Sequence, residues 1–284
     1  MQAISENIYI EDAYPGVTLG VIARPRGLIQ IDAPPSPEDG RSWRASLMNL
    51  NSGAERVLIN MDAHPDRTFG ARAMDCTIIA HEKTAAIFRS RPNTFKAQGD
   101  ETGADWESIP GLGSVRWAAP EISFGQQMTL YWGDGPVMLE SHPGPSSGAI
   151  WVILPEEKIV FVGDAVLKHQ PPFLASANLN HWIEALELLL SSTYKGYMIV
   201  SSRGGVVTTA MVKAQYEMIN LLNDKLNKLA AKKAPVSAAE KLVDTFASGY
   251  KVSAARHKQF TQRLRYGLAH YYARHYHAGH TSDE

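Results

Sequence analysis

The chain has 284 residues, of which 44% are hydrophobic and 20% charged, and its formal net charge is −1. This is the composition of an ordinary globular protein with room for one large domain or two modest ones. The near-neutral charge gives no support for a nucleic-acid partner or for an anionic membrane surface. Cys76 is the only cysteine, which excludes an intrachain disulfide and a zinc site built from cysteines.

The opening stretch MQAISENIYIEDAYPG contains acidic residues and lacks the apolar segment of a signal peptide. No apolar run in the sequence approaches the roughly 18 residues that cross a bilayer. We therefore expect a cytoplasmic protein without a membrane partner.

Short runs rich in β-branched and aromatic residues dominate the first two-thirds of the chain. They predict strands at 7–12, 17–24, 27–33, 56–62, 76–81, 128–133, 136–141, 149–154, 158–164 and 197–202. Helical patterns lie between them at 36–50 and 180–190. In the first, Ser36 is the expected N-cap and Pro37 the first helical residue. Strands mixed with helices over this length indicate a layered α/β domain.

The pattern changes after about residue 207, where all strand signals stop and apolar residues recur at helical spacing. We therefore divide the chain into an α/β domain at 1–207 and a helical extension at 208–284. Within the extension, Ser237 and Glu240 form a capping-box pattern that predicts the start of a helix. Ser253 is expected to cap the next helix.

Polar side chains follow four of the predicted strands, at the point where each strand ends. DAHPD follows 56–60, SHPGPSSG follows 136–140, Asp164 ends KIVFVGD, and SSRGG follows 197–200. In layered α/β folds, loops of this kind assemble sites from residues that are distant in sequence. The sequence therefore predicts one site formed by these loops.

In these motifs and their spacing the chain resembles the metallo-β-lactamase-fold superfamily, in particular its glyoxalase-II-like hydrolases. The run SHPGPSSGAIWVILPEEKIVFVGDAV follows the family's loop, strand, turn, strand and GD pattern without gaps. The resemblance implies an α/β fold, the four-layer αββα sandwich, with the C-terminal helical extension added to it. It also implies a site at one edge of the sandwich, where family members usually bind two metal ions.

At the family's metal-ligand positions the chain departs from the family pattern. That pattern is HxHxDH after one strand, then a His in a PGH loop, an Asp in a GD turn and a final His. His64, Asp66 and Asp164 keep the family residue. The other four positions, where the family has His, carry Asp62, Arg67, Pro145 and Arg203.

Proline offers no ligand atom and arginine stays protonated, so three of these positions cannot hold a metal. Converging carboxylates would repel one another without cations, and guanidinium groups supply both the charge and a bidentate geometry. We therefore predict a salt-bridged Asp/Arg cluster in place of the dinuclear centre, with no metal cofactor. The expected pocket residues are Asp62, His64, Asp66, Arg67, His142, Asp164 and Arg203.

Two functional hypotheses remain open. In the first, the protein is a metal-free member that binds a small, possibly anionic ligand, or acts as a scaffold or as one half of a homodimer. In the second, Asp62, His64 and Asp164 hold one divalent metal (Zn, Mn or Fe). The protein would then hydrolyse an ester, thioester or lactone, with Asp66 orienting or deprotonating the attacking water.

Some single residues have competing interpretations. Ser146 and Ser147 could act as nucleophiles only with His142 or His64 as the base, and no pairing is evident. Arg203 can form an anion nest with the glycine amides that follow it. The alternative, which we favour, is that Arg203 is buried against a carboxylate, that of Asp66.

Two loops could border the predicted pocket. HQPPFL at 169–174 follows GDAV, where the family places a substrate-side loop. His169 and Phe173 then either line the pocket or belong to a rigid, packed Pro-Pro turn. The polar, glycine-rich stretch at 92–113 predicts a loop, or a lid if the site is functional.

Overall fold

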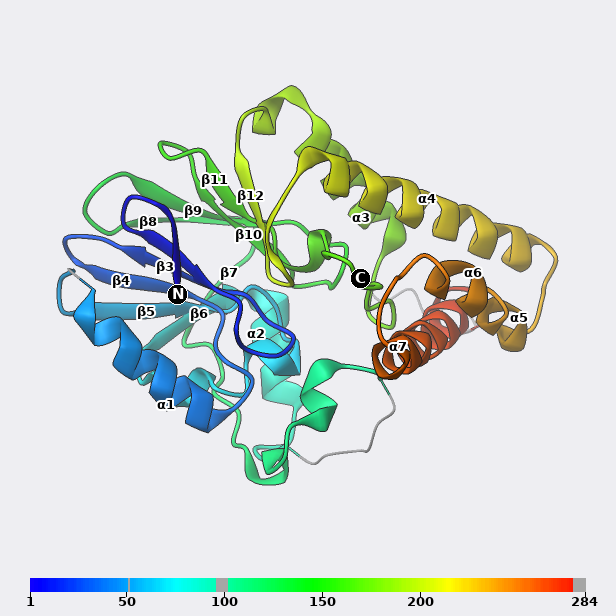
Figure 1. Cartoon of the computed structure of the whole chain (residues 1–284), viewed down its shortest axis with the longest axis horizontal. Helices are drawn as coiled ribbons and strands as arrows, with labels where there is room; N and C mark the ends of the chain where they lie inside the picture. Colours follow the sequence, from blue (N-terminus) through cyan, green and yellow to red (C-terminus); the bar gives the residue numbers. More distant parts are fainter. Residues whose placement is uncertain (51, 96–101, 278–284) are drawn as a thin grey trace.

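The computed structural model describes residues 1–50, 52–95 and 102–277. Two β-sheets stack face to face, and helices cover the outer face of each (Figure 1). The strands are β1 (Gln2–Ser5), β2 (Ile8–Glu11), β3 (Leu19–Ala23), β4 (Gly27–Ile31), β5 (Glu55–Ile59), β6 (Thr77–His81), β7 (Ile122–Phe124), β8 (Gln127–Tyr131), β9 (Pro136–Ser141), β10 (Ile150–Leu154), β11 (Ile159–Phe161), β12 (Met198–Ser201) and β13 (Gly205–Val207). The helices are α1 (Pro37–Ser46), α2 (Glu82–Ser90), α3 (Leu179–Leu190), α4 (Thr209–Ala231), α5 (Val236–Glu240), α6 (Val243–Ala247) and α7 (Ala254–Tyr272).

The first sheet has the order β1-β2-β3-β4-β5-β6-β7, and the second β13-β12-β11-β10-β9-β8. In the first sheet, β4 to β7 run parallel. In the second sheet, β11 and β12 form the parallel pair. The carboxyl ends of parallel neighbours lie at the same edge of a sheet, so the loops after β4, β5, β11 and β12 can meet there.

Side chains alternate along the strands between two hydrophobic layers. Ile150 and Val152 of β10 face the core between the sheets, whereas Trp151 and Ile153 face the core shared with α3 and α4. In the first sheet, Leu28 of β4 packs in the layer under α1. This period-two burial on both faces is what two covered sheets require. The predicted four-layer αββα fold is confirmed.

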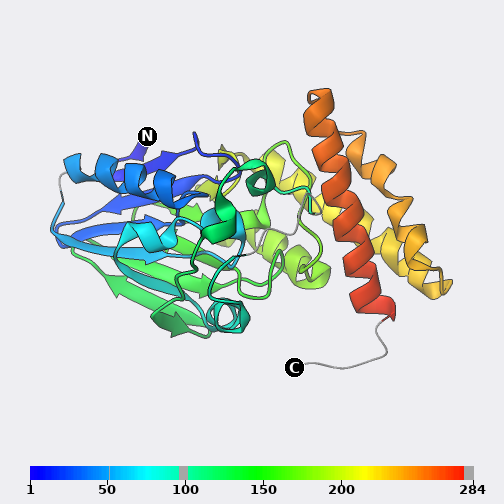
Figure 2. The same cartoon turned by 90° about the horizontal axis from the view of Figure 1, so that it is seen from below.

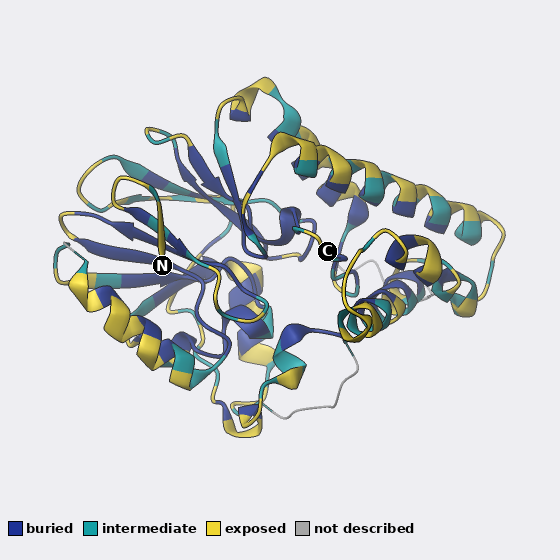
Figure 3. Ribbon diagram, in the orientation of Figure 1, coloured by how far each residue is buried: buried dark blue, intermediate teal, exposed yellow. Residues whose placement is uncertain are grey.

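The helical extension continues the core of the second sheet. Leu222 and Leu226 of α4 share one hydrophobic cluster with Leu264 and Leu268 of α7 and with the side chains of α3. Figure 2 shows α7 crossing the end of the sandwich, with α4 to α6 beside it. In Figure 3 the strands are largely buried, while α1 and α4 expose their outer faces. The division of the chain at residue 207 into two domains stays a prediction.

No helix within the described ranges is both long enough and apolar enough to cross a membrane. The two predicted caps at Ser36 and Ser253 are confirmed, because each side chain accepts a hydrogen bond from a backbone N–H of the helix it precedes. The predicted capping box is wrong. Helix α5 has Pro235 at its N-cap position, so Ser237 lies inside the helix.

The sequence patterns missed four elements, namely β1, β7, β13 and α2. The N-cap of helix α2 is a histidine and not one of the usual Ser, Thr, Asp or Asn residues. His81 Nδ1 accepts a hydrogen bond from Lys83 N. In the stretch predicted as a loop at 92–113, two short 3-10 helices are present, at Asp105–Ser108 and Leu112–Ser114. Residues 96–101 of that stretch lie outside the described part.

Candidate functional site

The loops at one edge of the sandwich bring most of the predicted site residues together. Each loop follows a strand that belongs to one of the parallel pairs. Asp62 and His64 follow β5, Asp66 and Arg67 lie in a 3-10 turn after it, Asp164 follows β11, and Arg203 lies between β12 and β13. We call Asp32, Asp62, Asp66, Asp164, Arg67 and Arg203 the Asp/Arg cluster.

Arg67 is fully buried and contacts three carboxylates. Its Nη2 donates to Asp164 Oδ1, and its Nη1 lies 3.3 Å from Asp62 Oδ2. Its Nε lies 3.7 Å from Asp32 Oδ2 and makes no hydrogen bond within the described residues. Arg67 thus joins the loops after β4, β5 and β11.

Arg203 is 1% exposed and binds two carboxylates. Its Nε is 3.0 Å from each oxygen of Asp164. Its Nη1 and Nη2 are 2.5 and 3.1 Å from the two oxygens of Asp66. Nη1 also donates to Gly16 O at 2.6 Å. This fork-like pairing is the geometry that guanidinium and carboxylate groups favour, and the contact expected between Arg203 and Asp66 is present.

The alternative interpretation of Arg203 as part of an anion nest is wrong. The backbone N–H groups of Gly204 and Gly205 both donate to Thr18 Oγ1 at 3.0 Å. An anion would have to displace this hydroxyl to reach them. The two glycines anchor the β12–β13 turn to the first sheet instead.

The cluster keeps its charges although it is buried. Burial alone would raise the pKa of Asp164, but Arg203 and Arg67 hold that pKa below its usual range. For Asp62, Arg67 and His64 likewise overcome burial and lower the pKa. Burial would lower the pKa of Arg67, but the surrounding carboxylates, Asp164 first, raise it. Each ion is therefore stabilised by its neighbours, and removing one leaves a buried charge without a partner.

Asp32 behaves differently from the other carboxylates. Burial raises its pKa to about 7, against the lowering effect of Arg67. Its Oδ1 accepts from Met61 N at 2.9 Å, and its Oδ2 accepts from Ser202 Oγ at 3.1 Å. Asp32 therefore ties the loop after β5 to the loop after β12.

His64 lies at the rim of the cluster. Its Nδ1 is 2.7 Å from Asp62 Oδ2, and its ring centroid is 5.5 Å from that of Phe173. Burial would lower the pKa of His64, but the Asp62 carboxylate raises it above its usual value. The other ring nitrogen, Nε2, has no hydrogen-bond partner in the part of the chain that the structure describes.

Three of these residues could in principle hold a metal. Asp62, His64 and Asp164 each offer one ligand atom, and these atoms lie within 4.8 Å of one another. However, Asp62 Oδ2 already contacts Arg67 Nη1, and both oxygens of Asp164 contact Arg203 Nε. Arg67 and Arg203 stand where a dinuclear centre needs ligands, and a guanidinium offers no lone pair. The residues present do not fit a dinuclear metal centre.

His142 lies apart from the contacts of the cluster. Its ring stacks on Trp151 with centroids 3.7 Å apart, and its Nε2 is 3.2 Å from Glu140 Oε2. Burial lowers its pKa, against the effect of Glu140. These contacts indicate a packing role for this imidazole.

A Ser–His contact exists away from the predicted serines, between Ser141 Oγ and His81 Nε2 at 3.1 Å. Because Nδ1 of His81 accepts from Lys83 N, the proton of the neutral ring lies on Nε2, and burial lowers the pKa of this ring. His81 therefore donates to the serine and cannot take its proton. This pair caps a helix and is not an activated nucleophile.

The sequence analysis missed a second ionic group, which joins the helical extension to the cluster. Arg263 of α7 is 1% exposed, and its Nη2 is 3.2 Å from Asp105 Oδ2. Arg256 Nη1 donates to the other oxygen of Asp105. No local pattern marks these residues, because Asp105 and Arg263 are brought together only by the packing of α7.

A cavity of about 150 Å³ lies between this group and the cluster. Its walls are mainly apolar and include Trp106, Phe173 and Leu174, while His64, Asp66 and Arg263 supply polar atoms. Phe173 therefore does line a pocket. His169 does not reach this cavity and lines another one.

Comparison with known proteins agrees with this fold. The family model of the metallo-beta-lactamase superfamily matches residues 63–197. These residues span β6 to β11 and include His64, Asp66, Arg67 and Asp164. This match assigns residues 63–197, a little under half of the chain, to the metallo-β-lactamase superfamily, and the αββα architecture of the whole domain agrees with it.

Solved structures of the superfamily superpose on this chain at low sequence identity. A metallo-beta-lactamase from Pontibacter korlensis is 19% identical, with a TM-score of 0.61 over 77% of this chain and 97% of that one. The metallo-beta-lactamase DIM-1 is 16% identical, with a TM-score of 0.60 over 78% and 95% of the two chains. Identity this low establishes a shared fold and nothing about activity.

The sec-alkylsulfatase Pisa1 from Pseudomonas sp. is 13% identical, with a TM-score of 0.66. Its match covers 96% of this chain, and so extends into the helical extension, but only 49% of the sulfatase. This chain thus spans about half the length of that enzyme. No curated protein sequence matches the chain. The expected likeness to glyoxalase-II-like hydrolases stays a prediction.

Proposed function

We propose that this protein is a metal-independent member of the superfamily that binds a small molecule, and that the Asp/Arg cluster replaces the metal centre. The observation that carries the proposal is the burial of Arg67 and Arg203, which are 0% and 1% exposed. Together they contact Asp62, Asp66 and Asp164, so the carboxylates at the metal edge are already neutralised by guanidinium groups.

The two guanidinium groups oppose the binding of a divalent cation here, because their repulsion offsets the attraction of the carboxylates. Unit charges about 4 Å apart repel by about 4 kcal/mol at an effective dielectric constant of about 20, and a divalent ion doubles that value for each guanidinium. The same burial leaves neither arginine with a surface on which to hold a ligand. The two arginines therefore hold the loops at this edge of the sandwich together.

Binding would then use the cavity of about 150 Å³ beside the cluster. Its apolar walls suit a small, mostly apolar molecule. The Asp62 carboxylate raises the pKa of His64 against the effect of burial, which favours the protonated ring, and in that form Nε2 would donate to one acceptor atom of the molecule. No group in this arrangement supplies an activated nucleophile.

The convergence of Asp62, His64 and Asp164 within 4.8 Å favours a second candidate, a hydrolase with one divalent metal. That function would require the metal to displace both guanidinium groups from the two carboxylates. An ester, thioester or lactone would be its substrate class.

Metal content separates the two candidates. The untagged protein, purified without chelator and dialysed against excess Zn, Mn and Fe, is analysed by plasma mass spectrometry. We expect less than about a tenth of an equivalent of any metal. About one equivalent, lost in His64→Ala, would overturn the proposal and favour the hydrolase.

Two variants serve as controls. Arg203→His alone is expected to stay metal-free, because Pro145 still offers no ligand and Arg67 still occupies the edge. The triple variant Arg67→His, Pro145→His, Arg203→His restores the family residue at three of the four changed positions and keeps Asp62, whose carboxylate can itself bind a metal. Metal uptake by the triple variant alone would show that the substituted residues exclude the metal in the native protein.

A further inference from the structure

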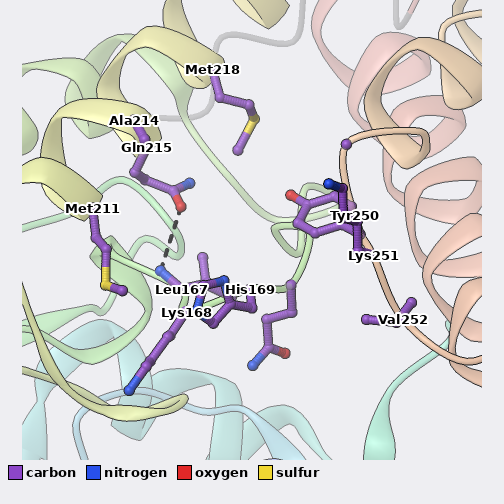
Figure 4. A pocket seen from close by; sticks show the side chains of 12 residues that line it. Leu167, Lys168, His169, Met211, Ala214, Gln215, Met218, Tyr250, Lys251 and Val252 are labelled. Carbon is purple, nitrogen blue, oxygen red and sulfur yellow. Dashed lines mark hydrogen bonds between the residues drawn. The ribbon is translucent and has the colours of Figure 1, made fainter.

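A second and larger cavity, of about 730 Å³, lies between α4, the segment that precedes α7 and residues 167–170 (Figure 4). It shares no lining residue with the cavity beside His64. Its volume is in the range of cavities that hold small organic ligands. The function proposed above makes no use of it.

Gln215 of α4 presents an unsatisfied hydrogen-bond donor at this cavity. The side chain is 6% exposed, and its Oε1 accepts from Leu167 N at 3.4 Å. Its Nε2 is buried and has no partner within the described part of the chain. Figure 4 shows the amide group directed into the space between α4 and Tyr250. A buried donor without a partner costs free energy, which an acceptor atom of a ligand would restore.

Tyr250 supplies a second donor from the opposite wall. Its hydroxyl faces Gln215 across the cavity in Figure 4, and no residue of the described ranges bonds to it. Burial raises the pKa of Tyr250 to about 12, so the hydroxyl keeps its proton at neutral pH. Two donors that converge on one space from facing walls fit a group with two acceptor oxygens.

The charges around the cavity have one sign. Lys168 and Lys251 line it together with His169, and no Asp or Glu is among the lining residues. Neither lysine has an ion-pair partner among the residues described. The apolar part of the lining comes chiefly from Met211, Met218 and Val252. Flexible thioether side chains of this kind adapt to apolar chains of varied shape.

We propose that this cavity binds a small amphipathic carboxylate. Its carboxylate oxygens accept from Gln215 Nε2 and from the Tyr250 hydroxyl, and the two lysines compensate its charge. Its apolar chain or ring lies against the two methionines. The site is independent of the Asp/Arg cluster and of whether that cluster excludes metal.

The first test uses the methionine methyl groups as reporters. The full chain, labelled with ¹³C at the methionine methyls, is titrated with decanoate, with decanol and with decyltrimethylammonium. Met211→Leu and Met218→Leu assign the two signals. We expect saturable shifts of both with decanoate, no shift of Met48, which is 78% exposed, and binding of decanol weaker by about tenfold or more. Absence of saturable shifts at these two methyls, or equal binding of decanol and decanoate, would overturn the proposal.

The second test changes the polar groups one at a time. Gln215→Glu keeps an acceptor for Leu167 N and replaces the Nε2 donor by an anionic oxygen, so the affinity for decanoate should fall by about tenfold or more. Lys168→Met with Lys251→Met should weaken decanoate binding similarly and leave decanol unchanged. Lys228→Met, on an exposed position of α4, is the matched control and should bind as the native protein does. Native affinity in both test variants would contradict the assignment.

Discussion

Two groups of arginines and carboxylates lie on either side of Phe173, and their charge balance differs. In the Asp/Arg cluster, carboxylates outnumber the arginines. At the junction with α7, Asp105 alone faces Arg256 and Arg263. The Phe173 ring lies 4.4 Å from the Cζ of Arg203 and 4.0 Å from the Cζ of Arg263, so it lies against one arginine of each group.

The pKa values show how each group is held. Burial would lower the pKa of Arg203, but Asp164 and Asp66 raise it. Burial and the nearby Arg203 lower the pKa of Arg263 to about 10. Arg263 is held largely by neutral acceptors, with its Nε 3.1 Å from Gly103 O and its Nη1 2.8 Å from Gln170 Oε1. Ion pairs therefore hold the Asp/Arg cluster together, whereas the junction with α7 depends on packing and on hydrogen bonds to neutral acceptors.

The largest loss in the free energy of unfolding should come from removing a carboxylate of the Asp/Arg cluster. Asp164→Asn replaces a carboxylate by an amide whose NH₂ would face guanidinium donors. We expect the free energy of unfolding to fall by about 3–5 kcal/mol, measured by urea denaturation. Asp75→Asn, which loses only a contact with the exposed Arg44, is the control and should have little effect. A loss below about 1 kcal/mol in Asp164→Asn would mean that the cluster is not electrostatically coupled.

A smaller loss in the free energy of unfolding is expected from variants at the junction with α7. Arg263→Leu removes one partner of Asp105 and the hydrogen bonds to Gly103 and Gln170, but Arg256 remains. We expect a loss of about 2 kcal/mol in the same denaturation assay. Arg256→Leu should cost less, because that side chain is 36% exposed in its pair with Asp105, whereas Arg263 is 1% exposed. Equal losses in the two variants would contradict the difference in burial.

The smallest effect on the free energy of unfolding at neutral pH should come from Asp32→Asn, and the sign of this effect depends on pH. The pKa of Asp32 is raised to about 7 by burial, against Arg67, so its contribution to stability is fully present below its unfolded pKa and is lost as pH rises through about 7. Asp62 and Asp164, whose pKa values are lowered by arginines against burial, contribute in the opposite sense and lose stability as pH falls.

Denaturation midpoints measured from pH 2 to 8 would test this difference, because the lowered pKa values of Asp62 and Asp164 place their loss of stability at the acid end of that range. Asp32→Asn should remove the component of stability that falls between about pH 4 and pH 7, while leaving the acid-side loss of Asp62 and Asp164 in place. An unchanged pH profile in Asp32→Asn would show that Asp32 titrates at an ordinary carboxylate pKa.

Most of the fold follows from local sequence patterns. Buried runs predict β4 and β10, because a strand covered on both faces needs mostly apolar side chains along its whole length. In β5 and β12 the last three residues are buried in the same way. The edge strands β1, β7 and β13 were not predicted, because a run of three or four residues is too short to show an alternating pattern. Only pairing with a neighbouring strand defines them. Helix α2 was not predicted because an imidazole, and not a hydroxyl or carboxylate, caps it.

By itself, the sequence determined the fold and the departures from the metal-binding pattern, since order and spacing of motifs are properties of the chain. Which oxygen each guanidinium contacts was decided only by the tertiary structure. The same holds for Asp105 and Arg263, which are 158 residues apart in sequence and meet only where α7 crosses the edge of the sandwich. Contacts of this kind depend on where whole elements lie in space, and no local pattern records that position.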